Sequence, residues 1–281
     1  MRDMKNNANC YTEESIVKWH EVDIRQEMRP YAFMNLAQEI AGTHANSLHF
    51  GYNDLKESNQ IWVLSRIKVR YIKYPKWGNR VSLETWHKGM QSLFGLRDFI
   101  LREIETAPNS KQECDKDSNT CILATSSWLI MNSKTRKLER SNVFNANSEI
   151  LQNANMQNAI EESCGRLRTQ PDMQKVSEHT VMYSDIDNLM HTNNAKYAEW
   201  ITNSIDIEIF KKYRIKEFQI NFNAETLLGD KVEILCKEIE TPAKIIEANN
   251  LGSNSRTLYF EGRKEGVAAF ESLFTFIPAE D

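Results

Sequence analysis

The spacing of hydrophobic and polar positions predicts a chain built mostly of strands, with one long amphipathic helix in each half. In the first half, the alternating segment 16–23 predicts a strand, and a helix is predicted to begin at Pro30, a residue common in first turns. Apolar residues three and four positions apart give this helix one buried face. They are Phe33, Leu36, Ala37, Ile40, Ala41 and Leu48. His44 lies near this face, and we expect it to be a core or rim residue.

Further strands are predicted where β-branched and aromatic residues concentrate. In the first half they are 61–72, 80–86, 96–105 and 120–131. In the second half, a short strand at 180–184 precedes a helix at 193–213, and strands follow at 215–223, 231–240, 244–249, 256–263 and 267–277. Two polar segments separate these elements: an exposed loop at 107–119, and a linker at 141–174 that is predicted to hold a short helix at 153–164.

An internal repeat links the two halves. Gly78 and Gly229 lie 151 residues apart, and each follows an alternating strand and precedes a polar residue, a cation and a second strand. Two copies of a strand, a long helix and an antiparallel sheet indicate an α+β protein of two tandem hotdog domains. In each domain, a long central helix is wrapped by a curved antiparallel sheet. We assign 1–140 to the N-terminal hotdog, 141–174 to the linker and 175–281 to the C-terminal hotdog.

Composition narrows the class of protein. The net charge of −4 gives no support for a nucleic-acid partner. The sequence contains no run of 18 apolar residues, so no membrane-spanning helix is predicted. The N-terminus has no apolar segment that could be a secretion signal. The five cysteines are odd in number and form no C-x-x-C, which argues against a disulfide scaffold or a zinc site. We therefore expect a cytoplasmic protein.

A cluster of polar residues precedes the second helix. It contains Asp187, His191 and Asn193, whereas the corresponding segment of the first half, 23–30, has no histidine or asparagine. In the same way, Glu225 aligns with Tyr74 of the first half. A feature needed only to cap the fold should occur in both copies, so this difference favours one active site per chain.

These residue types fit acyl transfer to water. A helix N-terminus offers N–H groups that can stabilise an oxyanion, here near Thr192 and Asn193. Glu225 could act as a general base, and a carboxylate such as Asp187 could orient His191. A covalent nucleophile finds no support, because no cysteine lies in these elements and no G-x-S-x-G motif is present.

Several motifs together resemble the acyl-ACP thioesterases, which release fatty acids from acyl carrier protein. Residues 187–197 resemble the signature D-x-N-x-H-x-N-N-x-K-Y of that family. Similar matches occur at 59–63 (N-x-I-W-V), 74–78 (Y-P-x-W-G), 126–132 (S-x-W-x-x-M-N) and 135–138 (T-R-K-L). The resemblance covers roughly 16–277, and it is the order of the motifs that makes it specific.

The resemblance implies hydrolysis of acyl-ACP thioesters without cofactor or metal. It places the acyl pocket mainly in the N-terminal half and the catalytic residues Asp187, His191 and Glu225 in the C-terminal half. One position departs from the pattern, because Leu189 stands where the family has a catalytic Asn. Either Asn188 or Asn193 substitutes for it, or the activity is weak or altered.

Two alternatives stay open: an acyl-CoA thioesterase on the same fold, and a non-catalytic module that binds acyl groups or acyl carrier protein. Homodimer formation is open as well. Because acyl carrier protein is acidic, its docking surface should be basic. The candidates are Lys68, Arg70, Lys73, Lys76, Arg80, Lys134, Arg136, Lys137 and Arg140.

Overall fold

The computed structural model describes residues 10–104, 118–139 and 156–279. The chain forms two compact units. The first comprises Met1–Ser65 and Ile72–Cys164, and the second comprises Arg66–Tyr71 and Gly165–Asp281. Strand β2 (Gln60–Tyr71) therefore contributes its first half to one unit and its second half to the other.

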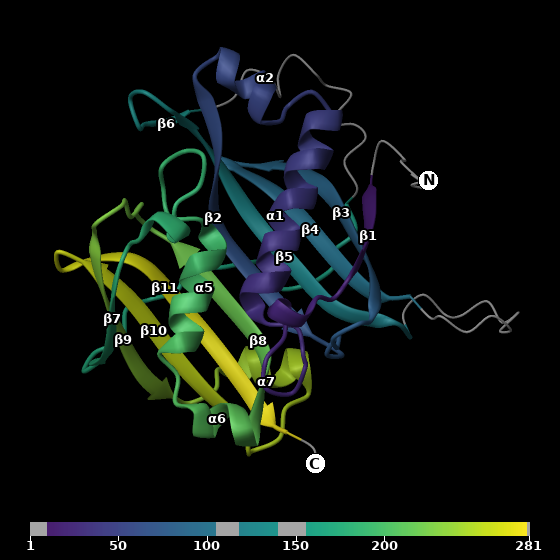
Figure 1. The fold of residues 1–281 in the computed structure, drawn as a ribbon, viewed down its shortest axis with the longest axis vertical. Helices are drawn as coiled ribbons and strands as arrows, with labels where there is room; N and C mark the ends of the chain where they lie inside the picture. Colours follow the sequence, from purple (N-terminus) through teal and green to yellow (C-terminus); the bar gives the residue numbers. More distant parts are fainter. Residues whose placement is uncertain (1–9, 105–117, 140–155, 280–281) are drawn as a thin grey trace, which may run out of the picture. The chain divides into compact units, whose positions relative to one another are not determined.

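The first unit is an antiparallel sheet with a long helix against it (Figure 1). The strands follow the order β1-β3-β4-β5-β2, and β6 pairs with β5. Their bounds are β1 Tyr11–Ile16, β3 Arg80–Gln91, β4 Phe94–Glu103, β5 Thr120–Asn132 and β6 Leu138–Glu139. The helices are α1 Pro30–Ser47, the short α2 Tyr52–Glu57 and the 3-10 turn η1 Trp19–Glu21.

Helix α1 forms where its sequence favours it. Pro30 occupies the first turn, where its missing N–H costs no hydrogen bond. Phe33, Ala37 and Ile40, which lie on one helical face, are at most 2% exposed. His44 continues this face and is also 2% exposed, which confirms its assignment as a core or rim residue.

The second unit repeats this plan. Its strands follow the order β2-β8-β11-β10-β9-β7, and neighbouring strands are antiparallel. Their bounds are β7 Gln174–Thr180, β8 Tyr213–Phe222, β9 Lys231–Ile239, β10 Arg256–Lys264 and β11 Val267–Pro278. The helices are α5 Asn194–Asn203, α6 Ile207–Lys212 and α7 Ala243–Asn249, together with the 3-10 turn η2 Tyr183–Asp185.

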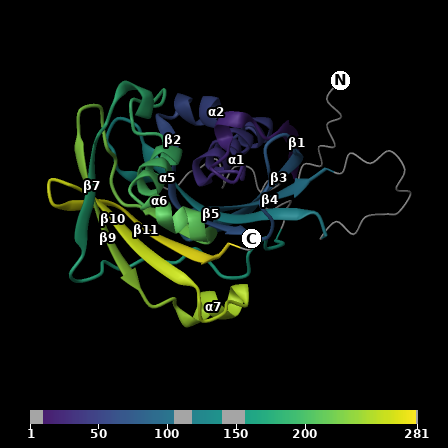
Figure 2. The ribbon, with the colours of Figure 1, turned by 60° about the horizontal axis from the view of Figure 1, so that its bottom comes forward.

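Helices α5 and α7 cover opposite faces of the second sheet (Figure 2). Tyr197 of α5 contacts Phe270 of β11 at 5.2 Å between ring centroids. Ile245 of α7 instead packs with Leu273 and Tyr259. Phe270 and Leu273 are three residues apart on one strand, so their side chains point to opposite faces.

Aromatic side chains fill the face under α5. Phe218 and Phe274 are paired across β8 and β11, are fully buried, and stack at 5.0 Å between centroids. The sheet of this unit also contains a buried ion pair, because Arg70 Nε of β2 lies 2.7 Å from Glu217 Oε2 of β8. Asn249 Nδ2 donates a further hydrogen bond to the same oxygen at 3.0 Å, so the buried carboxylate has two partners.

Each unit thus consists of a helix wrapped by an antiparallel sheet, and the predicted α+β class with two hotdog folds is confirmed. In the part of the chain that the structure describes, no helix is both long enough and apolar enough to cross a membrane.

The strands predicted before each helix are wrong in position. Strand β1 ends at Ile16, where the prediction had it begin, and β7 ends at Thr180. Val17 and Val181 extend the pairing by one residue, because their N–H groups donate to the carbonyls of Asn79 and Asp230, which directly precede the partner strands β3 and β9. The short 3-10 turns η1 and η2 then occupy part of the two predicted strands.

Two predicted helices and one predicted strand also differ from the structure. The helix predicted at 193–213 is two helices, because Asp206 accepts a hydrogen bond from the Glu208 N–H and caps α6 as a new helix. The strand predicted at 244–249 is helix α7, preceded by Pro242 and ended by the left-handed Asn250 (φ 50°). No helix forms over 156–164, the described part of the predicted helix 153–164. Residues 107–117 of the predicted loop and 141–155 of the predicted linker lie outside the described residues.

Candidate active site

A tight loop, residues 186–193, leads into helix α5; we call it the pre-helix loop. Asp187 holds it together, because its Oδ1 accepts the N–H of Leu189 at 2.8 Å and that of His191 at 3.4 Å. The Asp187 N–H donates in return to the His191 carbonyl at 2.8 Å. Met190 adopts φ 63° to close the turn. The Asp187 carboxylate therefore positions His191 through its backbone.

The structure brings His191 and Glu225 together. His191 Nε2 lies 3.2 Å from Glu225 Oε2, and the two side chains are 22% and 41% exposed. The loop after β8 carries Glu225 and is joined to the pre-helix loop by a β-bridge between His191 and Leu227 and by the Thr192 N–H, which donates to the Thr226 carbonyl. These backbone contacts fix an imidazole and a carboxylate side by side where water can reach both.

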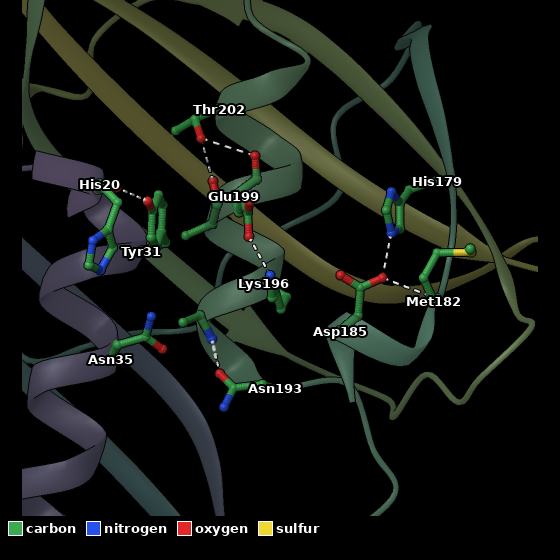
Figure 3. A network of polar contacts seen from close by, with 12 residues as sticks. His20, Tyr31, Asn35, His179, Met182, Asp185, Asn193, Lys196, Glu199 and Thr202 are labelled. Atoms are coloured by element: carbon green, nitrogen blue, oxygen red, sulfur yellow. Dashed lines mark hydrogen bonds and ion pairs between the residues drawn. The ribbon is translucent and has the colours of Figure 1, made fainter. Parts of the chain in front are cut away.

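Two of the polar residues suggested as supporting the site, Thr192 and Asn193, make hydrogen bonds within the fold. Thr192 is buried, and its Oγ1 lies 2.7 Å from Thr226 Oγ1. Tyr197 OH also contacts Thr226 Oγ1, at 2.9 Å. Asn193 is the N-cap of α5 and accepts the Ala195 N–H at 2.9 Å (Figure 3). Asn188 is exposed and Leu189 is half-buried.

The N–H groups of Thr192 and Asn193 themselves are already bound within the fold. Thr192 N–H donates to the Thr226 carbonyl at 3.0 Å and Asn193 N–H to the Asp185 carbonyl at 2.8 Å. In the first turn of α5, the side chain and carbonyl of Asn193 then accept from Ala195 and Lys196. Asn194 N–H, at the first helical position, donates to none of the residues described. It is the donor in this turn that remains available for an oxyanion.

The first unit contains the same loop without the histidine. Asp23 Oδ1 accepts the N–H groups of Arg25 and Glu27 at 2.8 and 3.0 Å, and Gln26 adopts φ 61°. Asp23 thus accepts the same two backbone hydrogen bonds as Asp187, from the N–H groups two and four residues later in the chain. Only part of the polar cluster is therefore specific to the second copy, because its aspartate, Asp187, caps a turn that Asp23 caps in the first copy.

The residues that differ between the copies are the interacting pair itself. Glu27 takes the place of His191, and its backbone forms a bridge with Lys76 just as His191 does with Leu227. Tyr74 takes the place of Glu225. With the scaffold held constant, the histidine and the glutamate are what distinguish the second loop, and they make it the candidate site.

A second histidine–carboxylate pair lies close by in the second unit and was not predicted. Asp185 Oδ2 lies 2.8 Å from His179 Nε2 and accepts the Met182 N–H at 2.8 Å (Figure 3). Burial opposes ionisation, but these hydrogen bonds lower the pKa of Asp185. In the first unit, Glu21 Oε2 accepts the Lys18 N–H in the same way at 2.7 Å. Alignment of Glu21 with Asp185 identifies this carboxylate as a cap of the 3-10 turn.

Comparisons with known proteins identify the family of this chain. The family model described as the acyl-ACP thioesterase N-terminal domain matches residues 8–143, and that of the C-terminal domain matches residues 168–266. An oleoyl-acyl carrier protein thioesterase of Arabidopsis thaliana is 26% identical over 261 residues, which cover 88% of this chain and 67% of the relative. A palmitoyl-acyl carrier protein thioesterase of the same plant is 26% identical over 74% of this chain and 50% of its own length. The chain thus spans one half to two thirds of these curated relatives.

Solved structures show the same fold. An acyl-ACP thioesterase from Bacteroides thetaiotaomicron is 25% identical with a TM-score of 0.75, covering 95% of this chain and 98% of that one. A 12:0-ACP thioesterase from Umbellularia californica has a TM-score of 0.78 at 21% identity, covering 96% and 94%. With both family domains matched in order over most of its length, this chain belongs to the acyl-ACP thioesterase family.

Proposed function

We propose that the protein hydrolyses fatty acyl-ACP thioesters to a free fatty acid and holo-ACP. The observation that carries this proposal is the contact of His191 with Glu225 at 3.2 Å, on a loop whose counterpart in the first unit lacks both residues. Family membership supports the reaction class. The acyl chain is proposed to bind in the first unit.

In the proposed reaction, Glu225 takes a proton from water as the water oxygen attacks the thioester carbonyl. His191, within hydrogen-bonding distance of Glu225, holds the carboxylate and the water in place. Negative charge develops on the carbonyl oxygen, and the Asn194 N–H at the start of α5 is placed to stabilise it. The intermediate then expels the thiolate of the carrier, which takes up the proton held by Glu225. Asp187 contributes by fixing the backbone of His191.

The proposed carrier is acyl carrier protein, docked on exposed basic residues of the first unit. Two of the residues suggested by the sequence cannot take part, because Lys68 and Arg70 are 6% and 9% exposed. Arg140 lies outside the described residues. The candidates that remain are exposed: Lys73, Lys76, Arg80, Lys134, Arg136 and Lys137.

The test is steady-state hydrolysis of acyl-ACP and acyl-CoA of equal chain length. His191→Ala and Glu225→Gln should each lower kcat by about 10²- to 10⁴-fold, the usual contribution of a positioned acid–base group. Tyr74→Phe, at the position in the first unit that matches Glu225, serves as the control and should keep kcat within about threefold, since it touches no reacting group.

Undiminished turnover in both variants would overturn this assignment of the site. A preference for acyl-CoA would select the acyl-CoA thioesterase instead. Tight binding of acyl-ACP without release of fatty acid by the wild type would select the non-catalytic module.

A further inference from the structure

Two exposed tryptophans contact each other on the first unit. Trp19 of η1 and Trp77 of the turn before β3 are 64% and 52% exposed, and their rings meet edge to face at 4.8 Å between centroids. Of the six tryptophans in the chain, these two are the exposed ones. Ile24, in the loop that follows η1, is exposed as well. A group of large apolar side chains in contact with water commonly marks an interaction surface.

Backbone hydrogen bonds hold the segments that carry the two indoles together. The Trp77 N–H donates to the Gln26 carbonyl, and the Gly78 N–H donates to the Val17 carbonyl, both at 2.9 Å. The exposed rings are therefore presented by a fixed backbone, so little conformational entropy is lost when a partner covers them.

Each tryptophan directly follows a lysine in the sequence. Lys18 and Lys76 are exposed, and neither ammonium group forms an ion pair with a residue that the structure describes. The nearby carboxylates are half-buried and bind backbone: Glu21 accepts the Lys18 N–H at 2.7 Å, and Asp23 accepts two N–H groups of its own loop. The side chains exposed beside the indoles are therefore cationic, although the whole chain has a net charge of −4.

The second copy has the exposed apolar side chains without the lysines. Alignment of Asp23 with Asp187 and of Gly78 with Gly229 pairs all four residues with apolar ones. The counterparts of Trp19, Trp77, Lys18 and Lys76 are Tyr183, Leu228, Met182 and Leu227, all of them exposed. The fold therefore does not require the two lysines, and their combination with tryptophan is specific to the first unit.

We propose that this surface binds the face of an anionic lipid bilayer. We call it the tryptophan patch and define it by Lys18, Trp19, Ile24, Lys76 and Trp77. Indole rings favour the membrane–water interface, and lysines near the surface are attracted to anionic head groups. Screening limits repulsion by the net negative charge of the chain to about 8 Å in physiological salt, so the charges of the patch itself decide. The inference is independent of the proposed function, because it concerns binding and not turnover.

Vesicle binding tests the proposal directly. The wild-type protein is sedimented with vesicles of phosphatidylcholine, and with vesicles in which a third of this lipid is replaced by phosphatidylglycerol. We expect binding to the anionic vesicles that weakens as salt is raised. Brominated acyl chains should quench tryptophan fluorescence, and this signal reports the patch because the two exposed indoles belong to it.

The contribution of charge is measured with two lysine variants. Lys18→Ala combined with Lys76→Ala should lower partitioning onto anionic vesicles by about 10- to 30-fold, or about fivefold for each lysine. Lys211→Ala combined with Lys212→Ala is the matched control, because it removes the same charge from two exposed lysines at the end of α6. Its partitioning should stay within about twofold of the wild type.

The contribution of the indoles is measured in the same way. Trp19→Ser combined with Trp77→Ser should abolish the quenching and lower partitioning by about 10-fold or more, since the apolar area that enters the interface is lost. Tyr183→Ser combined with Leu228→Ser, at the matching positions of the second unit, should leave both signals unchanged. Melting temperatures report whether each variant folds.

A wild-type protein that binds no anionic vesicles at low salt overturns the inference, and so does equal binding to neutral and anionic vesicles. Undiminished binding by both folded patch variants does the same, as does an equal loss in the second-unit control. Lys76 is also a candidate for carrier docking, so turnover is compared for the tryptophan variant, whose KM for acyl-ACP without vesicles should be unchanged. A raised KM in a protein that ignores vesicles would make the patch a docking surface for the carrier and overturn the inference, while the proposed function stands.

Discussion

The role of Asp187 is defined by its two backbone partners. Its carboxylate accepts from the N–H groups of Leu189 and His191, and Asp23 repeats these bonds in a loop that lacks the histidine. Because an acceptor oxygen is all that this task needs, an amide side chain can perform it almost as well. Under the proposed mechanism, Asp187 therefore acts by positioning the backbone of His191.

This role predicts a split between two substitutions. Asp187→Asn keeps the acceptor and should retain kcat within about threefold, whereas Asp187→Ala leaves two N–H groups without it and should lower kcat by about 10-fold or more. Asp23→Ala is the matched control; it should lower the melting temperature without lowering kcat. If Asp187→Asn is as inactive as His191→Ala, the carboxylate takes a direct part in the chemistry.

Leu189 can also be understood at this scale. Its N–H is bound by Asp187, and its half-buried side chain offers no polar group. Asn188 is exposed, and the side chain of Asn193 is used as a helix cap. Under the proposed mechanism, water is therefore held by His191 and Glu225, and no asparagine of this loop replaces the one expected at position 189.

At the scale of elements, the break between α5 and α6 is the clearest departure from sequence periodicity. Ile201, Ile205 and Ile209 continue one apolar stripe, yet Asp206 caps a new helix through the Glu208 N–H at 2.9 Å. Asp206→Ala should lower the free energy of unfolding by about 1 kcal/mol, the typical value of an N-cap. Denaturant titration measures this, with Asp206→Asn as the control that retains a capping oxygen. An unchanged midpoint for the alanine variant would show that packing alone ends α5.

Most elements could be predicted from the sequence because their signals are local. The 3.6-residue stripe of α1 and the alternation in β8 and β11 depend on neighbours in the chain. The errors occur where a distant contact decides. Strands β1 and β7 end where their partners β3 and β9, far along the chain, begin, and the N–H groups of Val17 and Val181 make the last contacts with the carbonyls of Asn79 and Asp230.

The candidate site could likewise be predicted from the sequence only in part. The motif and the repeat identified His191 and Glu225, because residue types and spacing were sufficient. They could not show that the Thr192 and Asn193 N–H groups are already bound, since Thr226 is 34 residues away from Thr192. Proline before α7 and asparagine after it were available as helix signals, but the apolar residues between them resembled a strand.

At the scale of the whole molecule, the two units share a scaffold and differ in what it holds. The hydrogen bonds of the loop before the helix recur in both copies. The first copy carries Glu27 and Tyr74 where the second has His191 and Glu225. The two copies thus differ in the polar groups that the shared loop presents. Under the proposed function, the first unit binds the acyl chain and the second unit cleaves the thioester.

The aspartate-capped loop of the first unit should also accept a transplant. Its shape depends on Asp23 and not on the residues at positions 27 and 74, so Glu27→His combined with Tyr74→Glu should fold with the loop intact. In an NMR titration, the introduced histidine should have a higher pKa in the double variant than in Glu27→His alone, because a neighbouring carboxylate favours the imidazolium. Equal pKa values would mean that the scaffold does not bring the two positions together. We therefore expect that the loop of the first unit can hold a histidine–glutamate pair after two substitutions, without further changes to the protein.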